Sequence, residues 1–231
     1  MSIAIAYSCK DFSIIATDTL VTYGNGFQED SNDKIMQIYQ HGMGFISGTG
    51  SAKIKEAAYD YLKDASEKDM NTLLKNAYRI SYDKNPNLSS DAYANILISY
   101  MSRNGPDVIF LMCNGDYETI KHNMFFILPP SDIPENSFPP VIINSLEYNY
   151  NSDFNEFLIK LGELFSYFSE NSLYVSSKIR CGLHYYFDDK SDNVRRREWS
   201  YPEVSQMIEN ARSKAYAAID YEVNNHRCYR D

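Results

Sequence analysis

The hydrophobic positions of this chain begin with two short apolar runs that lie close together. Ile3–Tyr7 and Phe12–Ala16 flank the polar segment Ser8–Asp11, whose composition is typical of a tight turn. This pattern predicts a β-hairpin at the start of the chain. Two more strands are expected at Lys34–Ile38, where apolar and polar residues alternate, and at Gly42–Ile46, which runs into a glycine-rich segment.

The apolar spacing then changes to that of helices. Apolar residues at three- and four-residue intervals predict a helix after Ser51 and another over Met70–Tyr82. A third amphipathic helix is expected at Phe154–Phe168 and a fourth at Val204–Val223. The remaining strands are expected at Ala94–Met101, Asp107–Cys113, Tyr117–Ile127, Tyr174–Leu183 and His184–Phe187.

The order of these elements is strands, two helices, strands, helix, strands, helix. Strands grouped apart from helices favour an α+β layered fold over alternating βαβ winding. The chain has 231 residues, which suits one large domain or two small ones, and no repeat or low-complexity linker divides it. We therefore expect a single domain over residues 1–231.

Composition and charge exclude several classes of partner. Apolar residues make up 44% and charged residues 23%, as in ordinary soluble globular proteins. No apolar run approaches the ~18 residues of a membrane span, and the first residues lack the features of a secretory signal. We expect a cytoplasmic protein without membrane contact. The net charge of −9 argues against a nucleic-acid partner, because phosphate binding requires a basic surface.

The remaining charged and metal-binding residue types show no functional pattern. The only basic cluster, Arg195–Arg197, sits among acidic residues and is interpreted as a solvated, salt-bridged loop. The four cysteines and four histidines are scattered, without the spacing of a metal site or a disulfide framework. The sequence therefore predicts no metal and no cofactor.

Ser2 is the first residue with a chemical signal. An initiator methionine before a small residue is usually removed, which would give Ser2 a free α-amine. An N-terminal hydroxyl residue can act as a nucleophile while its own amine serves as the base. The ordinary pKa of that amine, ~7.7–8.0, suits proton transfer near neutral pH. Many proteins begin Met-Ser, so Ser2 by itself is weak evidence for this chemistry.

The residues after Ser2 keep one ungapped register with a known family up to Gly48. The matching segments are Ser2–Tyr7, Ile14–Asp18, Thr22–Asn25, Asp33–Ile35 and Gly44–Gly48. This stretch resembles the N-terminal part of proteasome β subunits and their bacterial relatives, which are N-terminal-nucleophile hydrolases. Counted from the nucleophile, Asp18, Lys34 and Gly48 fall where that family keeps its aspartate, its lysine and its oxyanion-hole glycine.

The resemblance implies a four-layer αββα sandwich and a role for each of these residues. The Lys34 ammonium would lower the pKa of the Ser2 hydroxyl, and Asp18 would keep the lysine charged and oriented. The Gly48 N–H would donate to the oxyanion of the tetrahedral intermediate. Each residue also has a purely structural interpretation. Asp18 could cap a turn, Lys34 could be a surface charge on an edge strand, and Gly48 could end a strand. Taken together in the family register, they favour catalysis.

The later part of the chain departs from the family pattern. The family's Ser-Gly-Ser-type or Gly-Ser-Gly-type turn has no counterpart in Phe125–Ser131. The family also has an aspartate and a serine just before a Gly-Gly strand start, and in the best match here they become Ser172 and Val175. In the family these groups tune the α-amine and position water. The departures leave open a catalytically silent scaffold or binding subunit as the alternative function, and an amidase acting on a small molecule as a third.

The function implied by the resemblance is hydrolysis of peptide or other amide bonds through an acyl-enzyme on Ser2, without a cofactor. The expected partners are a peptide or protein substrate and further copies of the chain in a homo-oligomeric ring. If the resemblance extends to assembly, an ATP-dependent unfoldase would feed the chamber.

Overall fold

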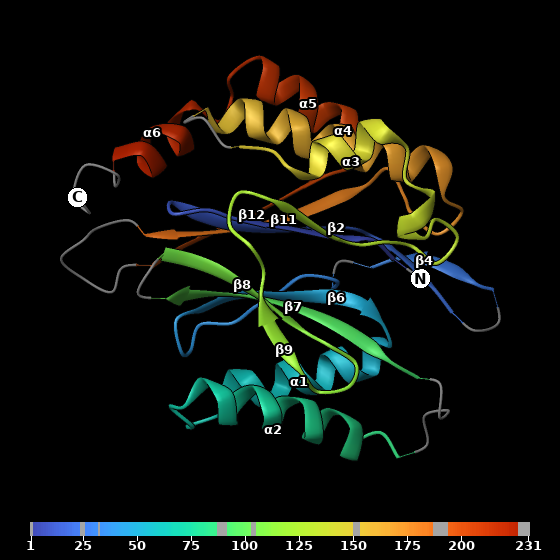
Figure 1. The fold of residues 1–231 in the computed structure, drawn as a ribbon, viewed down its shortest axis with the longest axis vertical. Coiled ribbons are helices and arrows are strands. Elements are labelled where there is room, and N and C mark those ends of the chain that lie inside the picture. Colours follow the sequence, from blue (N-terminus) through green and yellow to red (C-terminus); the bar gives the residue numbers. More distant parts are fainter. Residues whose placement is uncertain are drawn as a thin grey trace.

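The chain folds into four layers, with two β-sheets face to face and helices outside each sheet (Figure 1). The computed structural model describes residues 2–23, 26–31, 33–86, 92–102, 105–149, 153–186 and 194–225. The predicted α+β, αββα sandwich is confirmed. The parts of the predictions that concern Met1, Gly24, Asn25 and Phe187 lie outside the described residues.

The first sheet is antiparallel and has the strand order β10-β1-β2-β11-β12. Its strands are β1 (Ala4–Ser8), β2 (Phe12–Asp18), β10 (Phe125–Leu128), β11 (Ile179–Tyr186) and β12 (Val194–Tyr201). The predicted hairpin is present as β1 and β2. Ser8 pairs with Ser13 beside the turn, and Ala4 pairs with Thr17 at the other end. This register brings the first residues of the chain beside Asp18.

The second sheet is also antiparallel, with the order β5-β6-β7-β8-β9. Its strands are β5 (Met36–Gln37), β6 (Met43–Gly50), β7 (Ala94–Ser102), β8 (Gly105–Leu111) and β9 (Tyr117–Thr119). A separate two-stranded ribbon pairs β3 with β4 near the start of the chain. Its strands are β3 (Leu20–Thr22) and β4 (Gln28–Asp30).

The helices form the two outer layers (Figure 1). The second sheet is covered by α1 (Ala52–Asp64) and α2 (Met70–Asp83). The first sheet is covered by α3 (Pro140–Leu146), α4 (Phe154–Asn171), α5 (Val204–Arg212) and α6 (Ala217–Asn225), and a short 3₁₀ turn at Glu135–Ser137 precedes α3. In the described part of the chain, none of these helices has both the length and the apolar character to cross a bilayer.

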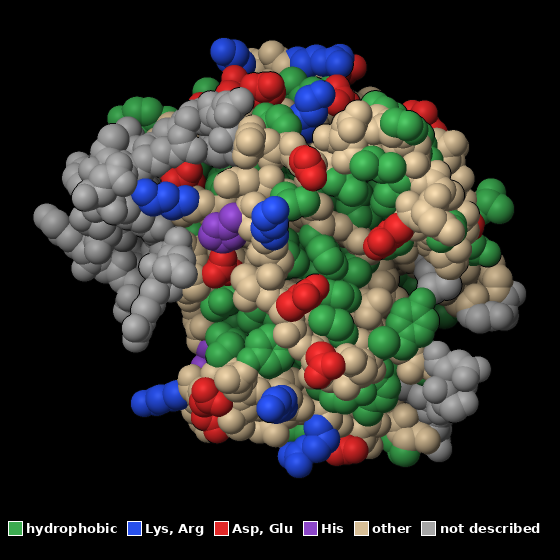
Figure 2. Space-filling model, in the orientation of Figure 1, with side chains coloured by type: hydrophobic (Ala, Val, Ile, Leu, Met, Phe, Trp, Pro, Cys, Tyr) green, Lys and Arg blue, Asp and Glu red, His purple; other side chains and the backbone are tan. Residues whose placement is uncertain are grey.

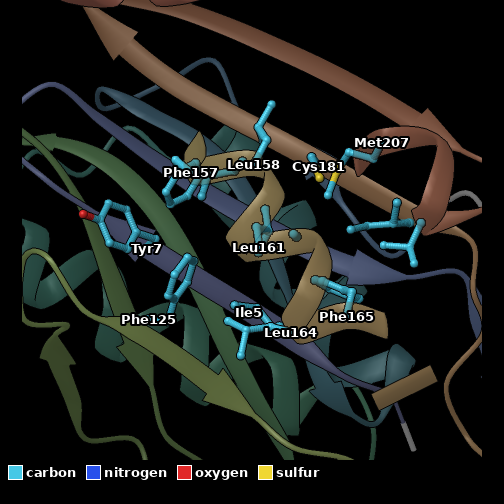
Figure 3. Close-up of a cluster of buried hydrophobic side chains, with 14 of the residues drawn as sticks. Ile5, Tyr7, Phe125, Phe157, Leu158, Leu161, Leu164, Phe165, Cys181 and Met207 are labelled. Atoms are coloured by element: carbon cyan, nitrogen blue, oxygen red, sulfur yellow. The ribbon is translucent and has the colours of Figure 1, made fainter. Parts of the chain in front are cut away.

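Helix α4 packs its apolar face onto the first sheet and forms the largest core. Its buried side chains recur at three- and four-residue intervals, as an amphipathic helix requires. Figure 3 shows this contact, where Phe157 of α4 meets aromatic side chains of β1 and β10. The Phe157 ring lies 4.8 Å from the Tyr7 ring and 5.4 Å from the Phe125 ring, centroid to centroid.

A second apolar layer lies between the two sheets and contains side chains from both of them. The members of this inter-sheet layer include Ala4, Ala6, Ile15, Phe45, Leu97 and Val108. Because β2 is central and covered on both faces, all seven of its residues are buried. This double burial explains why apolar residues are consecutive at Ile14–Ala16 rather than strictly alternating with polar ones.

Two strand predictions were wrong in their boundaries. Instead of one strand over Tyr117–Ile127, the chain forms β9 and β10 in different sheets. The turn between them includes Asn123 with a φ of 61°, a left-handed conformation that asparagine tolerates better than most residues. The two strands predicted from Tyr174 onward are a single strand, β11, that begins only at Ile179.

The interpretation of Arg195–Arg197 as a loop was also wrong, because these residues belong to edge strand β12. The Arg197 guanidinium pairs with Glu222 of α6 at 2.9 Å, and the Arg196 side chain donates to the Met43 carbonyl of the second sheet. A salt bridge is therefore present, as expected, but it connects β12 to α6, and the Arg196 hydrogen bond connects β12 to the second sheet. On the face shown in Figure 2, basic and acidic side chains are interspersed, so this face carries no continuous basic surface.

The last predicted helix is interrupted. Val204–Val223 corresponds to α5 and α6, with a turn between them in which Lys214 has a φ of 57°. A left-handed residue cannot continue an α-helix, so the chain changes direction there.

Candidate active site

The centre of the candidate site is a buried ion pair between Asp18 and Lys34. Asp18 is the last residue of β2, and Lys34 lies in the turn that precedes β5. The Lys34 Nζ lies 2.8 Å from Asp18 Oδ1, and the two side chains are 5% and 0% exposed. The structure therefore brings together two of the predicted site residues, which are sixteen positions apart in sequence.

The Asp18 carboxylate also accepts three main-chain hydrogen bonds. The Ile3 N–H donates to Oδ1 at 3.3 Å, and the N–H groups of Leu20 and Ser176 donate to Oδ2 at 2.9 and 3.3 Å. These donors come from three separate parts of the chain. Asp18 thus joins the N-terminal segment, the strand after it and the loop before β11 around one carboxylate.

Burial shifts the proton affinities of both partners. Desolvation raises the pKa of the Asp18 carboxyl, and the nearby Lys34 charge and the hydrogen bonds to the carboxylate oppose that shift. Desolvation likewise lowers the pKa of the Lys34 ammonium, and the attraction of Asp18 opposes it. The lysine therefore releases a proton more readily than a lysine in water does.

Ser2 lies at the edge of this cluster. It is half-buried, and its neighbour Ile3 donates to Asp18. Its Oγ donates to the Leu20 carbonyl at 3.4 Å, while the Leu20 N–H holds the other side of the Asp18 carboxylate. Among the described residues, the Ser2 hydroxyl makes no hydrogen bond with Lys34. The expected contact between the Lys34 ammonium and this hydroxyl is thus not formed in this conformation.

Gly48 lies in β6 opposite Ile96 of β7, and its backbone is packed tightly against that strand. A Cβ atom at this position would lie 2.0 Å from the Asn95 carbonyl oxygen. Only glycine fits so close an approach. Gly48 therefore has a structural requirement that is independent of any oxyanion chemistry.

This contact makes a stability prediction for Gly48→Ala. Because the obstacle is backbone rather than a flexible side chain, the sheet must shift, and we expect a loss of about 1–3 kcal/mol or more in the free energy of unfolding. Urea denaturation measures this loss. Gly26→Ala is the matched control, because its added Cβ meets nothing within 4 Å although its φ is 82°. Equal stability of the two variants would contradict the packing explanation.

Three residues near the pair were not singled out by the sequence. The Ser47 Oγ and the Lys55 Nζ both donate to the Lys34 carbonyl, at 2.8 and 3.1 Å. The Ser176 N–H donates to Asp18. Ser176 directly follows Val175, the residue that the family register matches to the family's serine. The Ser176 hydroxyl also lies 3.3 Å from the Thr19 hydroxyl. Moving the register by one residue would have placed a serine at this site.

Ser172, matched to the family's aspartate, lies in a different environment. Its hydroxyl donates to Asp132 Oδ1 at 2.8 Å, and the Leu173 N–H donates to the other oxygen of the same carboxylate. Ser172 therefore fixes the end of α4 against the loop after β10. In the described part of the chain, no three His, Cys, Asp or Glu side chains are grouped as a metal site.

The proteasome subunit family model matches residues 2–127, which is more than half of the chain. The chain belongs to the proteasome subunit family. The matched segment contains Ser2, Asp18, Lys34, Gly48 and the helix that carries Lys55. No curated protein matches the sequence.

Solved structures share the fold of this family member over nearly its full length. An Anbu (ancestral beta-subunit) from Yersinia bercovieri is 14% identical with a TM-score of 0.68, covering 94% of this chain and 95% of that one. The Anbu (Gly-1) mutant from Hyphomicrobium sp. strain MC1 is 14% identical with a TM-score of 0.67, covering 95% and 96%. A helical assembly of the Anbu complex from Pseudomonas aeruginosa is 12% identical with a TM-score of 0.68, and the match covers 95% of this chain and 96% of that one. At such low identity the likeness establishes the fold alone.

Proposed function

We propose that this family member is an N-terminal-nucleophile hydrolase that cleaves peptide or other amide bonds through Ser2 after removal of Met1. The observation that carries the proposal is the buried Asp18–Lys34 pair, positioned beside Ser2 by the N–H groups of Ile3 and Leu20. A buried ion pair is costly to desolvate and is weak evidence for stability alone. A pair with shifted pKa values at the start of the chain suits catalysis better.

The proposed reaction has two stages. The Ser2 Oγ attacks the carbonyl carbon and transfers its proton to the free α-amine, and the Gly48 N–H donates to the resulting oxyanion. Collapse of the tetrahedral intermediate breaks the C–N bond, and the leaving amine takes the proton. Water then attacks the ester on Ser2 and gives a proton to the α-amine. The C–Oγ bond breaks, the acid leaves, and that proton returns to the Ser2 Oγ. Lys34 stabilises the developing alkoxide, and Asp18 holds Lys34 in place.

Removal of Met1 is the step that makes this chemistry available. While Met1 is attached, the Ser2 nitrogen is an amide and cannot accept a proton. After its removal, the amine forms and the Ser2 hydroxyl must leave the Leu20 carbonyl and turn toward Lys34. The proposal therefore requires a rotation of the Ser2 side chain.

The second candidate function is a catalytically silent proteasome-like scaffold or binding subunit. It is favoured by the hydrogen bond from Ser2 to Leu20 and by the structural role of Ser172 against Asp132. Under this alternative the Asp18–Lys34 pair only anchors the N-terminal strand.

Hydrolysis of a panel of fluorogenic peptides and simple amides by wild-type protein and by Ser2→Ala separates the two candidates. The hydrolase proposal predicts turnover that Ser2→Ala abolishes, with an unchanged unfolding midpoint because Ser2 is half-buried and makes one long hydrogen bond. Equal rates for the two proteins would exclude Ser2 as the nucleophile.

We also propose that the chain assembles with further copies of itself. One solved relative forms a helical assembly, which supports self-association, and the ring is the form that the family resemblance implies. Light scattering should give a mass several times the 26.6 kDa of the monomer. A monomer at micromolar concentration and physiological salt would contradict a self-compartmentalised hydrolase. A cytoplasmic location and an ATP-dependent unfoldase partner stay predictions of the same proposal.

A further inference from the structure

Lys55 is a second buried lysine, and its side chain contacts the main chain of Lys34. It belongs to the first turns of α1, and its side chain points inward so that the residue is only 8% exposed. Its Nζ donates to the main-chain carbonyls of Asp33 and Lys34, at 3.2 and 3.1 Å. No ion pair of Lys55 with a carboxylate is formed among the described residues.

The Lys34 carbonyl has its full number of hydrogen bonds. The Ser47 Oγ donates to it at 2.8 Å from β6, and the Lys55 Nζ donates to it from α1. A carbonyl oxygen has two lone pairs, so these two donors satisfy it. The main chain of Lys34 is thereby fastened to a strand and a helix, while its side chain reaches Asp18 on the opposite sheet.

The position of Lys55 is unfavourable for a cation. It is buried, and it lies near the positive end of the α1 dipole, where acidic residues are preferred. Burial and the like charge of Lys34 lower the pKa of Lys55 to about 8, against the weaker attractions of Glu56 and Asp33. The hydrogen bonds of the Lys55 ammonium to the Asp33 and Lys34 carbonyls offset part of this cost.

We infer that Lys55 is a positioning residue for Lys34: its hydrogen bond to the Lys34 carbonyl holds the main chain of Lys34 in register with Asp18. The importance of this role for turnover rests on the proposed hydrolase function. The geometric role does not, and it is testable in a protein without activity.

The test is an NMR titration of Lys34 in protein labelled with ¹³C at the lysine ε-carbons, with the Lys34 signal assigned by its loss in Lys34→Met. Lys55→Met removes the donor to the Lys34 carbonyl, so we expect the Lys34 pKa to differ from the wild-type value, because the ammonium is no longer held against Asp18. Lys55→Arg keeps a donor and should leave the Lys34 pKa unchanged. Lys53→Met is the matched control, since Lys53 is exposed on the same helix. An unchanged Lys34 pKa in a folded Lys55→Met protein would overturn the inference.

Turnover gives a second reading. If the wild-type protein hydrolyses amides, Lys55→Met should lower kcat by about 10- to 100-fold with little change in KM, because misplacing a catalytic group acts on the transition state. Wild-type protein without turnover would refute the proposed function, while the NMR titration would still decide the role of Lys55.

If Lys55→Met does not fold, Ser47→Ala removes the other donor to the Lys34 carbonyl and should lower kcat in the same way. Full kcat in a folded Ser47→Ala would count against positioning through that carbonyl.

Discussion

Replacing Lys34 by methionine is expected to reduce acylation of Ser2 by at least about 100-fold, the range in which a positioned proton-transfer or charge-stabilising group acts. The substitution removes the ammonium that is paired with Asp18, while the methionine keeps much of the volume. In the proposed mechanism that charge stabilises the developing alkoxide on Ser2. The rate is measured with an electrophilic peptide probe that traps N-terminal hydroxyl nucleophiles.

The control for Lys34→Met is Lys53→Met, which removes an exposed lysine and should acylate at the wild-type rate. Unfolding of both variants must be followed in parallel, because Lys34→Met leaves the Asp18 carboxylate buried without its cation. Wild-type acylation by a folded Lys34→Met protein would exclude Lys34 from the mechanism.

Asp18→Asn is expected to cost about 3–5 kcal/mol in the free energy of unfolding, as the loss of one partner from a buried ion pair does. The Lys34 ammonium would stay buried at 5% exposure with no carboxylate beside it. The amide NH₂ of asparagine would also face N–H donors that now bond to Asp18, since three main-chain groups converge on that carboxylate. Urea denaturation at neutral pH measures the loss.

A double-mutant cycle identifies the cause. In Asp18→Asn combined with Lys34→Met both charges are gone, so the double variant should be more stable than the sum of the single losses predicts. Additive losses would mean that the two residues do not interact across the 2.8 Å contact. The single Asp18→Asn variant should also lose acylation, because its lysine is no longer oriented.

The parts of the fold that the sequence predicted are those with a strong local pattern. The first hairpin has two short apolar runs around a polar turn, and helix α4 has amphipathic spacing; both patterns favour the structure that is observed. The errors arose where tertiary contacts decide. The strand β12 carries three consecutive arginines, and Arg196 is accommodated because it reaches the Met43 carbonyl of the other sheet. No local pattern reports such a contact.

The candidate site shows the same division. Asp18 and Lys34 were found because they keep an ungapped register from Ser2, and the structure places them in contact. Lys55 was missed because a lysine on an amphipathic helix is usually a solvated side chain, and only the packing of α1 shows it buried. Ser176 was missed by one position, since the loop before β11 has no periodicity that fixes its register.

The central claim is that Ser2, with a free amine, is the nucleophile, and one measurement tests it most directly. The intact mass of the natively produced protein is recorded before and after reaction with the electrophilic peptide probe, and the adduct is then located by peptide mapping. The account predicts a chain lighter by one methionine that gains one probe, attached to Ser2. A chain that keeps Met1, or an adduct at another residue, would contradict it.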